Sequence, residues 1–177
     1  MIIAIICILV IGTTFLLYSI YHDKLIFLTI KLDNIEEKIN STLIKRKELL
    51  KHVEDIIKEK LKTEKNVFDG LDELSDTSDI IKLDRKLLVY ISEFHLIKDK
   101  YENLNNDENF QKVSFTIVET EDLLNAYKNY YNDNVTNYNK LIRKFPVIFT
   151  TILKRRKEKE FFDNKSINDN DYSEFKY

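Results

Sequence analysis

Two tyrosine–asparagine pairs, Tyr131-Asn132 and Tyr138-Asn139, form the most regular polar pattern in the chain. They lie seven residues apart, which places both on one face of a helix about two turns apart. A tyrosine can bury its ring and lead its hydroxyl to a partner or to water, and an asparagine can fix helix register through hydrogen bonds. We therefore expect a structural role for the pairs. The alternative is a polar groove that binds a peptide.

Glu64 is the second residue whose position suggests chemistry, because it lies on an apolar stripe between Leu61 and Phe68. A carboxylate on an apolar face needs a partner or a raised pKa. Arg46, Lys128 or a backbone cap could supply that partner. We expect a satisfied structural pair. An active-site carboxylate is the alternative, although the sequence places no second carboxylate or histidine to work with it.

The histidines are not spaced for metal chemistry. A helical-bundle metal site needs paired Glu-x-x-His motifs, and none of His22, His52 and His95 follows a glutamate at that spacing. The sequence also lacks His-Glu-x-x-His, a Gly-rich phosphate loop and a serine or cysteine nucleophile motif. We therefore predict no catalytic, cofactor-binding or metal-binding residues and no enzyme activity. A metal-dependent helical-bundle enzyme is the alternative from another class.

The composition indicates which elements must position these residues. The chain has 177 residues, 44% of them apolar and 33% charged, with only two Gly and one Pro. So few turn residues exclude a β-sandwich, a barrel and a doubly wound α/β fold. A single Cys excludes an intrachain disulfide framework, and a net charge of −2 does not indicate nucleic-acid binding. The prediction is an all-α protein with long helices.

The first 22 residues contain no charge, and Ile2 to Tyr21 is an apolar run long enough to span a bilayer as a helix. A cleaved signal peptide is the alternative, but no Lys or Arg precedes the run and no small-residue cleavage site follows it. Lys24, Lys31 and Lys38 follow the run. Because basic residues stay inside, we predict a single-pass cell-membrane protein with its N-terminus outside and its remainder in the cytoplasm.

Residues 22–145 show apolar residues at three- and four-residue steps almost throughout, which is typical of packed helices. Polar clusters at 75–79 and 105–107 predict breaks, with helices starting near Ile80 and after the cap Asp107. Pro146 should close the last helix. We also place a turn near residues 40–42, since an uninterrupted helix over 22–75 would be roughly 80 Å long. This predicts an antiparallel up-and-down bundle of four helices. The runner-up has three helices, the first of them a long stalk.

The C-terminal part differs in composition from the bundle. Residues 147–153 are apolar but too short to span a membrane. A basic run follows, with Phe161-Phe162 behind it. Two interpretations of this run remain open: it attaches to an anionic membrane leaflet, or it is a solvated tail. The candidate lipid contacts are Lys154, Arg155, Arg156 and Lys157. The predicted domains are an anchor over 1–22, a bundle over 23–146, a basic and aromatic segment over 147–162, and a disordered tail over 163–177.

Several of these residues recur in the order of a known family pattern. The pattern combines Tyr-Pro-x-Leu, Asn-Phe, Thr-Glu, Tyr-Asn-x-x-Val-x-x-Tyr-Asn and Phe-Pro. The chain matches it without a gap at Tyr101, Leu104, Asn109, Phe110, Thr120, Glu121, Tyr131, Asn132, Val135, Tyr138, Asn139, Phe145 and Pro146. Upstream, the basic run containing Arg46 and the position of Glu64 also fit. On these residues, and with the anchor, residues 1–162 resemble the LemA family. Among the departures, Tyr127-Lys128 replaces Ala-Arg, and Thr63 replaces the histidine of a His-Glu pair.

The resemblance implies a membrane-anchored antiparallel helical bundle and no particular activity. We therefore expect a membrane-tethered scaffold or interaction module with the lipid bilayer and an unidentified protein as partners, and with no nucleic acid or cofactor. A membrane-surface protein that binds or remodels lipid is the alternative. The sequence leaves open whether the chain forms a homo-oligomer.

Overall fold

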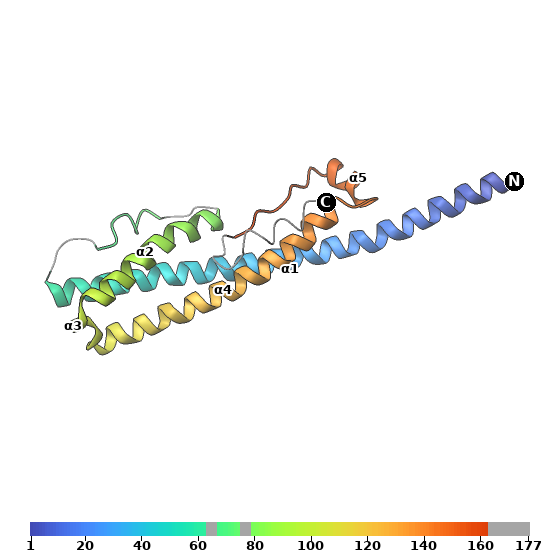
Figure 1. Cartoon of the computed structure of the whole chain (residues 1–177). Coiled ribbons are helices and arrows are strands. Elements are labelled where there is room, and N and C mark those ends of the chain that lie inside the picture. The colour runs from blue at the N-terminus through green and yellow to red at the C-terminus, as the bar shows by residue number, and fades with distance from the viewer. Residues whose placement is uncertain (63–66, 75–78, 163–177) are drawn as a thin grey trace. The chain divides into compact units, whose positions relative to one another are not determined.

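The computed structural model describes residues 1–62, 67–74 and 79–162, and within these ranges it contains helices and no strand. The helices are α1 (Ile2–Leu61), α2 (Ile80–Lys100), α3 (Glu102–Asn105), α4 (Glu108–Ile142) and α5 (Val147–Leu153) (Figure 1). The predicted all-α class is confirmed. Glu64 and the predicted tail over 163–177 lie outside the described residues.

The turn predicted near residues 40–42 is wrong, because α1 continues through this position. The Ser41 and Thr42 hydroxyls donate to the Lys38 carbonyl oxygen over 2.9 and 2.8 Å, so these polar side chains are satisfied within the helix. The buried residues Leu32, Ile35, Ile39 and Leu43 also stay at three- and four-residue steps across the position. The chain therefore follows the runner-up arrangement, with three long helices in the described part.

The chain divides into two compact units, each described here by itself. The first contains Met1–Ile35 and the chain from Asn129 onward, and the second is Glu36–Lys128. Both α1 and α4 contribute a part to each unit.

In the second unit, the predicted helix starts are confirmed. Asp79 caps α2, because its Oδ1 accepts hydrogen bonds from the amides of Ile81 and Lys82. Asp107 caps α4 in the same way and accepts from the Phe110 amide over 2.9 Å. The helix start near Ile80 and the cap Asp107 could be predicted because a capping acceptor and the amides that it satisfies are only two or three residues apart.

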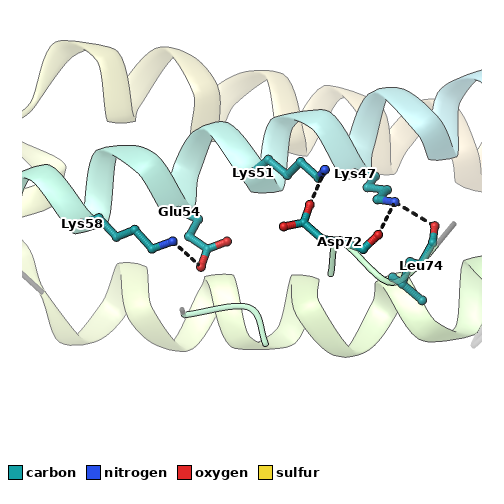
Figure 2. A network of polar contacts seen from close by, with 6 residues as sticks. All are labelled: Lys47, Lys51, Glu54, Lys58, Asp72 and Leu74. Atoms are coloured by element: carbon teal, nitrogen blue, oxygen red, sulfur yellow. Dashed lines mark hydrogen bonds and ion pairs between the residues drawn. The ribbon is translucent and has the colours of Figure 1, made fainter. Parts of the chain in front are cut away.

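Helix α1 ends at Leu61, earlier than its apolar stripe suggested, and residues 67–74 form turns that lie along α1 (Figure 2). Lys51 pairs with Asp72, and Lys47 Nζ donates to the Leu74 carbonyl oxygen over 2.8 Å. Glu54 Oε1 accepts from the Val67 amide over 2.9 Å. The apolar side chains of this segment are buried: Phe68, Leu71 and Leu74. The segment therefore has its own packing and is not an extension of the helix.

The direction of α2 is a departure from an up-and-down order. Lys60 Nζ lies 2.7 Å from Asp107 Oδ2, and the Lys38 ammonium faces the Tyr127 ring, so α4 runs antiparallel to α1 in this unit. Residues 67–74 already carry the chain back along α1, because they meet Glu54 first and Lys47 last. Helix α2 therefore runs parallel to α1 in the second unit, which the apolar spacing alone could not predict.

In the first unit, α1 includes a segment long and apolar enough to cross a membrane, with a mean hydropathy of 2.5 and no buried residue in that window. The Thr13 and Thr14 hydroxyls donate to the Leu9 and Val10 carbonyl oxygens over 2.9 and 2.8 Å. These bonds satisfy the hydroxyl protons of Thr13 and Thr14 within the helix, as a lipid environment requires. The coarser part of the membrane prediction, an N-terminal apolar helix that fits a span, is therefore confirmed.

Candidate functional site

The C-terminal part of α4, from Asn129, presents the tyrosine–asparagine face in the first unit. Tyr131, Val135 and Tyr138 are buried along this stretch, in the four- and three-residue steps that the sequence predicted. Asn132 is also buried, and Asn139 is half-buried beside the same stripe. Both carboxamides therefore lie where a neighbouring segment can cover them.

Each asparagine side chain forms two hydrogen bonds with the main chain of one residue near the C-terminal end of the described chain. Asn139 Nδ2 donates to the Lys159 carbonyl oxygen and Asn139 Oδ1 accepts from the Lys159 amide, both over 3.0 Å. Asn132 makes the same pair with Phe162, over 3.1 Å to the carbonyl oxygen and 2.9 Å from the amide. We call Asn132 and Asn139 the asparagine ladder and residues 157–162 the docked segment.

The spacing of the ladder follows from the geometry of the two elements. Seven residues of α-helix rise by about 10.5 Å, at 1.5 Å per residue. Three residues of extended chain advance by about 10 Å, at 3.3 Å per residue. The ladder positions are seven apart and their partners, Lys159 and Phe162, are three apart. The repeat on the helix therefore matches an extended segment that runs antiparallel to α4.

Side-chain contacts fix the register of the docked segment. The Phe162 ring is 1% exposed and meets the Tyr131 ring edge-on, with 5.1 Å between ring centroids. At the other end, Arg143 Nε donates to Glu158 Oε1 over 2.6 Å. Phe162 was grouped with the basic run as a candidate for membrane attachment, but its burial against Tyr131 shows that the ring has a protein partner. A slip by one residue would remove this ring from its site.

A cluster of buried charges lies in the second unit, with one contribution from each long helix. Lys128 of α4 and Asp84 of α2 form an ion pair of 2.6 Å. Arg46 of α1 is 2% exposed, and burial lowers its pKa, against the opposing attraction of Glu121 and Asp84. Within the described residues, no atom hydrogen-bonds Arg46 Nε or Asp84 Oδ1. Because each of the three long helices α1, α2 and α4 supplies a charge, the cluster can fix which faces of these helices meet.

These residues can be compared with those of known protein families. The model of the LemA family matches residues 35–173. The chain belongs to the LemA family. No curated protein matches the chain. The buried cluster and the asparagine ladder both lie within the matched range. Among the residues that carry the LemA resemblance, Arg46 belongs to the cluster, and Asn132 and Asn139 form the ladder.

Other residues of the LemA pattern have local or packing roles. Thr120 is buried and donates to the Ile117 carbonyl oxygen over 2.7 Å, and Glu121 Oε1 lies 3.4 Å from His95 Nε2. Tyr101 ends α2, and Phe110 packs its buried ring against Phe94 at 6.1 Å between centroids. Pro146 is buried and Phe145 is exposed after the end of α4. These residues therefore do not converge with the ladder on one site.

Two relationships were not predicted from the sequence. The partners of the ladder are main-chain groups of Lys159 and Phe162, which carry no side-chain signature that could identify them. The pairing of Lys128 with Asp84 was also missed, although Lys128 replaces an arginine of the LemA pattern and so keeps the positive charge. No group of three metal-ligating side chains lies together within residues 1–62, 67–74 and 79–162.

Proposed function

We propose that this LemA-family chain is a membrane-tethered interaction module that binds extended polypeptide segments on the asparagine ladder, and that its role is binding and not catalysis. The observation that carries the proposal is the double hydrogen bond between each ladder asparagine and one main-chain residue. In the structure the chain's own docked segment occupies this surface.

The chemistry of the ladder supports a peptide as its ligand. A carboxamide has one carbonyl acceptor and an NH₂ donor, which matches the amide and carbonyl of any residue except proline. Main-chain bonds of this kind give affinity with little dependence on sequence, and pockets for side chains add specificity. Here the Tyr131 ring supplies the specific contact, because it packs against the Phe162 ring, three residues after Lys159. The proposed ligand is therefore an extended segment with that spacing.

The proposed location rests on α1. Its apolar segment supports a single membrane span, and Lys24, Lys31 and Lys38 follow that segment with no basic residue before it. The excess of basic residues on one side supports an N-terminus outside the cell membrane and a cytoplasmic bundle. The ladder would then face cytoplasmic partners.

A competition experiment tests the proposal. The docked segment is part of the same chain, and tethering gives it an effective concentration in the mM range for a short linker. A variant that ends at Arg156, purified in detergent micelles, should therefore bind a fluorescein-labelled peptide of residues 157–162 more tightly than the full chain does. Adding Asn132→Leu and Asn139→Leu to that variant should abolish the binding, which fluorescence anisotropy would measure.

The matched control is Asn137→Leu, because Asn137 is exposed on the same helix and bonds only its local Asp133 carbonyl oxygen among the described residues. Equal peptide binding by the ladder variant and the Asn137 variant would refute the proposal. If the truncated chain loses its helical circular dichroism, the full chain provides the test. Excess peptide should then speed amide exchange at Lys159 and Phe162 in the intact protein, and unchanged exchange would also refute it.

A further inference from the structure

Helix α5 and Phe145, which lies two residues before it, carry an exposed apolar face in the first unit. Phe145, Phe149 and Ile152 are 60%, 59% and 67% exposed and follow one another at steps of four and three residues. The Phe145 and Phe149 rings lie edge-to-face, 5.9 Å apart. The opposite side of α5 is buried through Val147 and Thr151. The helix is therefore held against the protein by one face and presents aromatic rings on the other.

A contact with α1 places this face near the end of the apolar segment. Lys144 Nζ lies 5.9 Å from the centroid of the Tyr21 ring. Tyr21 is the last residue of the uncharged apolar run, and Asp23 is the first charged residue after it. Phe145 follows Lys144 directly, and in Figure 1 α5 lies beyond the end of α4 toward the blue part of α1. The exposed rings thus begin at the level where α1 would leave the hydrocarbon.

Charge supports the same surface. Lys154, Arg155 and Lys157 follow α5 directly and are exposed. Basic residues close to a membrane surface are attracted by anionic lipid headgroups. Aromatic rings concentrate at the same depth of a bilayer, where one edge is apolar and the surroundings are wet. The exposed rings therefore suit the boundary between headgroups and acyl chains, and the exposed basic residues beside them suit the anionic headgroups.

We propose that α5 and Phe145 form a second membrane contact, in which Phe145, Phe149 and Ile152 insert at the boundary between headgroups and acyl chains. Lys154, Arg155 and Lys157 would bind anionic headgroups of the same leaflet. The bilayer is the proposed occupant because the face lies next to the end of the apolar segment of α1 and is followed by cationic residues. The inference rests on the proposed span of α1 and is independent of peptide binding by the ladder.

The chain contains no Trp, so a single introduced Trp reports on its own surroundings. We would compare the full-length variants Phe149→Trp, Phe15→Trp and Phe115→Trp. Phe15 lies in the apolar segment, and Phe115 is 66% exposed on α4 and serves as the matched control. Each variant is reconstituted into vesicles of phosphatidylcholine and phosphatidylglycerol whose acyl chains carry bromine near the headgroup. Bromine quenches Trp only on close approach, so loss of fluorescence locates the ring in lipid.

The expected result is a blue-shifted emission and strong bromine quenching for Phe149→Trp, quenching for Phe15→Trp, and neither effect for Phe115→Trp. Replacing Lys154, Arg155 and Lys157 with Glu should weaken the quenching of Phe149→Trp in anionic vesicles. If Phe149→Trp behaves like Phe115→Trp while Phe15→Trp is quenched, the second contact is refuted and the span stands. A blue shift without quenching would show that protein covers α5, such as a second copy, and would also refute the proposal. Without quenching of Phe15→Trp, the span itself would fail, and the inference with it.

Discussion

Lys128 Nζ lies 2.6 Å from Asp84 Oδ2, and the two side chains are only 4% and 2% exposed. The residues are far apart in sequence and belong to α4 and α2. Removing one member of a buried ion pair leaves an uncompensated charge, whereas replacing both by apolar residues is often neutral or stabilising. The pair therefore makes a strong prediction about single and double substitutions.

Lys128→Met should destabilise the second unit by roughly 3–5 kcal/mol, because Asp84 would stay buried without its ion-pair partner. The double variant Lys128→Met with Asp84→Leu should recover part of that loss, because it removes the unpaired carboxylate but also one of the two carboxylates that attract the buried Arg46. Urea unfolding of the full chain in micelles, followed by circular dichroism, measures both. A double variant that is less stable than Lys128→Met alone would show that the pair does not act as described.

Asn132→Asp should loosen the docked segment without unfolding α4. The carboxylate keeps an acceptor for the Phe162 amide, but it loses the donor and faces the Phe162 carbonyl oxygen. Leaving a buried acceptor unsatisfied costs about 1–3 kcal/mol. Hydrogen exchange at the Phe162 amide should accelerate, while Asn137→Asp on the exposed side should leave it unchanged. Equal protection in the two variants would contradict the role assigned to the ladder.

Acid should weaken the contact between the end of α1 and the start of α4. A hydrogen bond from Lys60, then one from the Phe110 amide, holds the pKa of Asp107 below its usual range. A group with a depressed folded-state pKa stabilises the fold above its unfolded pKa, about 3.9 for Asp. That stabilisation is lost as pH falls through the lower folded value. The difference in melting temperature between the wild-type chain and Asp107→Asn should therefore be constant near neutral pH and shrink below about pH 4. A difference that does not vary with pH would contradict this assignment.

Gly70 should tolerate alanine poorly. Its φ of +78° lies in the left-handed region, and an added Cβ would meet Tyr90 Oη at 3.4 Å. We expect Gly70→Ala to cost about 1–2 kcal/mol, the cost of that conformation for a residue with a Cβ. Gly12→Ala is the control, because a Cβ there meets nothing within 4 Å and the backbone is helical. Thermal melts of both variants compare them directly.

The sequence could predict those structural features that depend only on residues close to one another in the chain. The helix start near Ile80, the cap Asp107 and the apolar run of α1 could be predicted because each depends on a few neighbouring residues or on one helix. The turn near residues 40–42 was predicted from the length of the helix alone. The three- and four-residue spacing of the buried apolar residues continues across this position, as a single helix requires: Leu32, Ile35, Ile39 and Leu43. Local pattern was the better guide at this position.

The candidate site could not be predicted in the same way. Asn132 and Asn139 were singled out by their spacing, but Phe162 lies 30 residues from Asn132 and offers only main-chain atoms to it. The observed partners are main-chain groups of the same chain and not side chains of a neighbouring helix. A docked segment of this kind becomes predictable only when the rise of seven helical residues is compared with the length of three extended residues.

The asparagine ladder also limits how the docked segment can vary in evolution. Its hydrogen bonds end on amide and carbonyl groups, which every residue except proline possesses. Substitutions at Lys159 other than proline therefore keep the two main-chain hydrogen bonds to Asn139, whereas proline removes the amide donor. Position 162 is held to an aromatic residue by Tyr131. Selection on the docked segment should thus appear as the exclusion of proline at position 159 and a requirement for an aromatic residue at position 162.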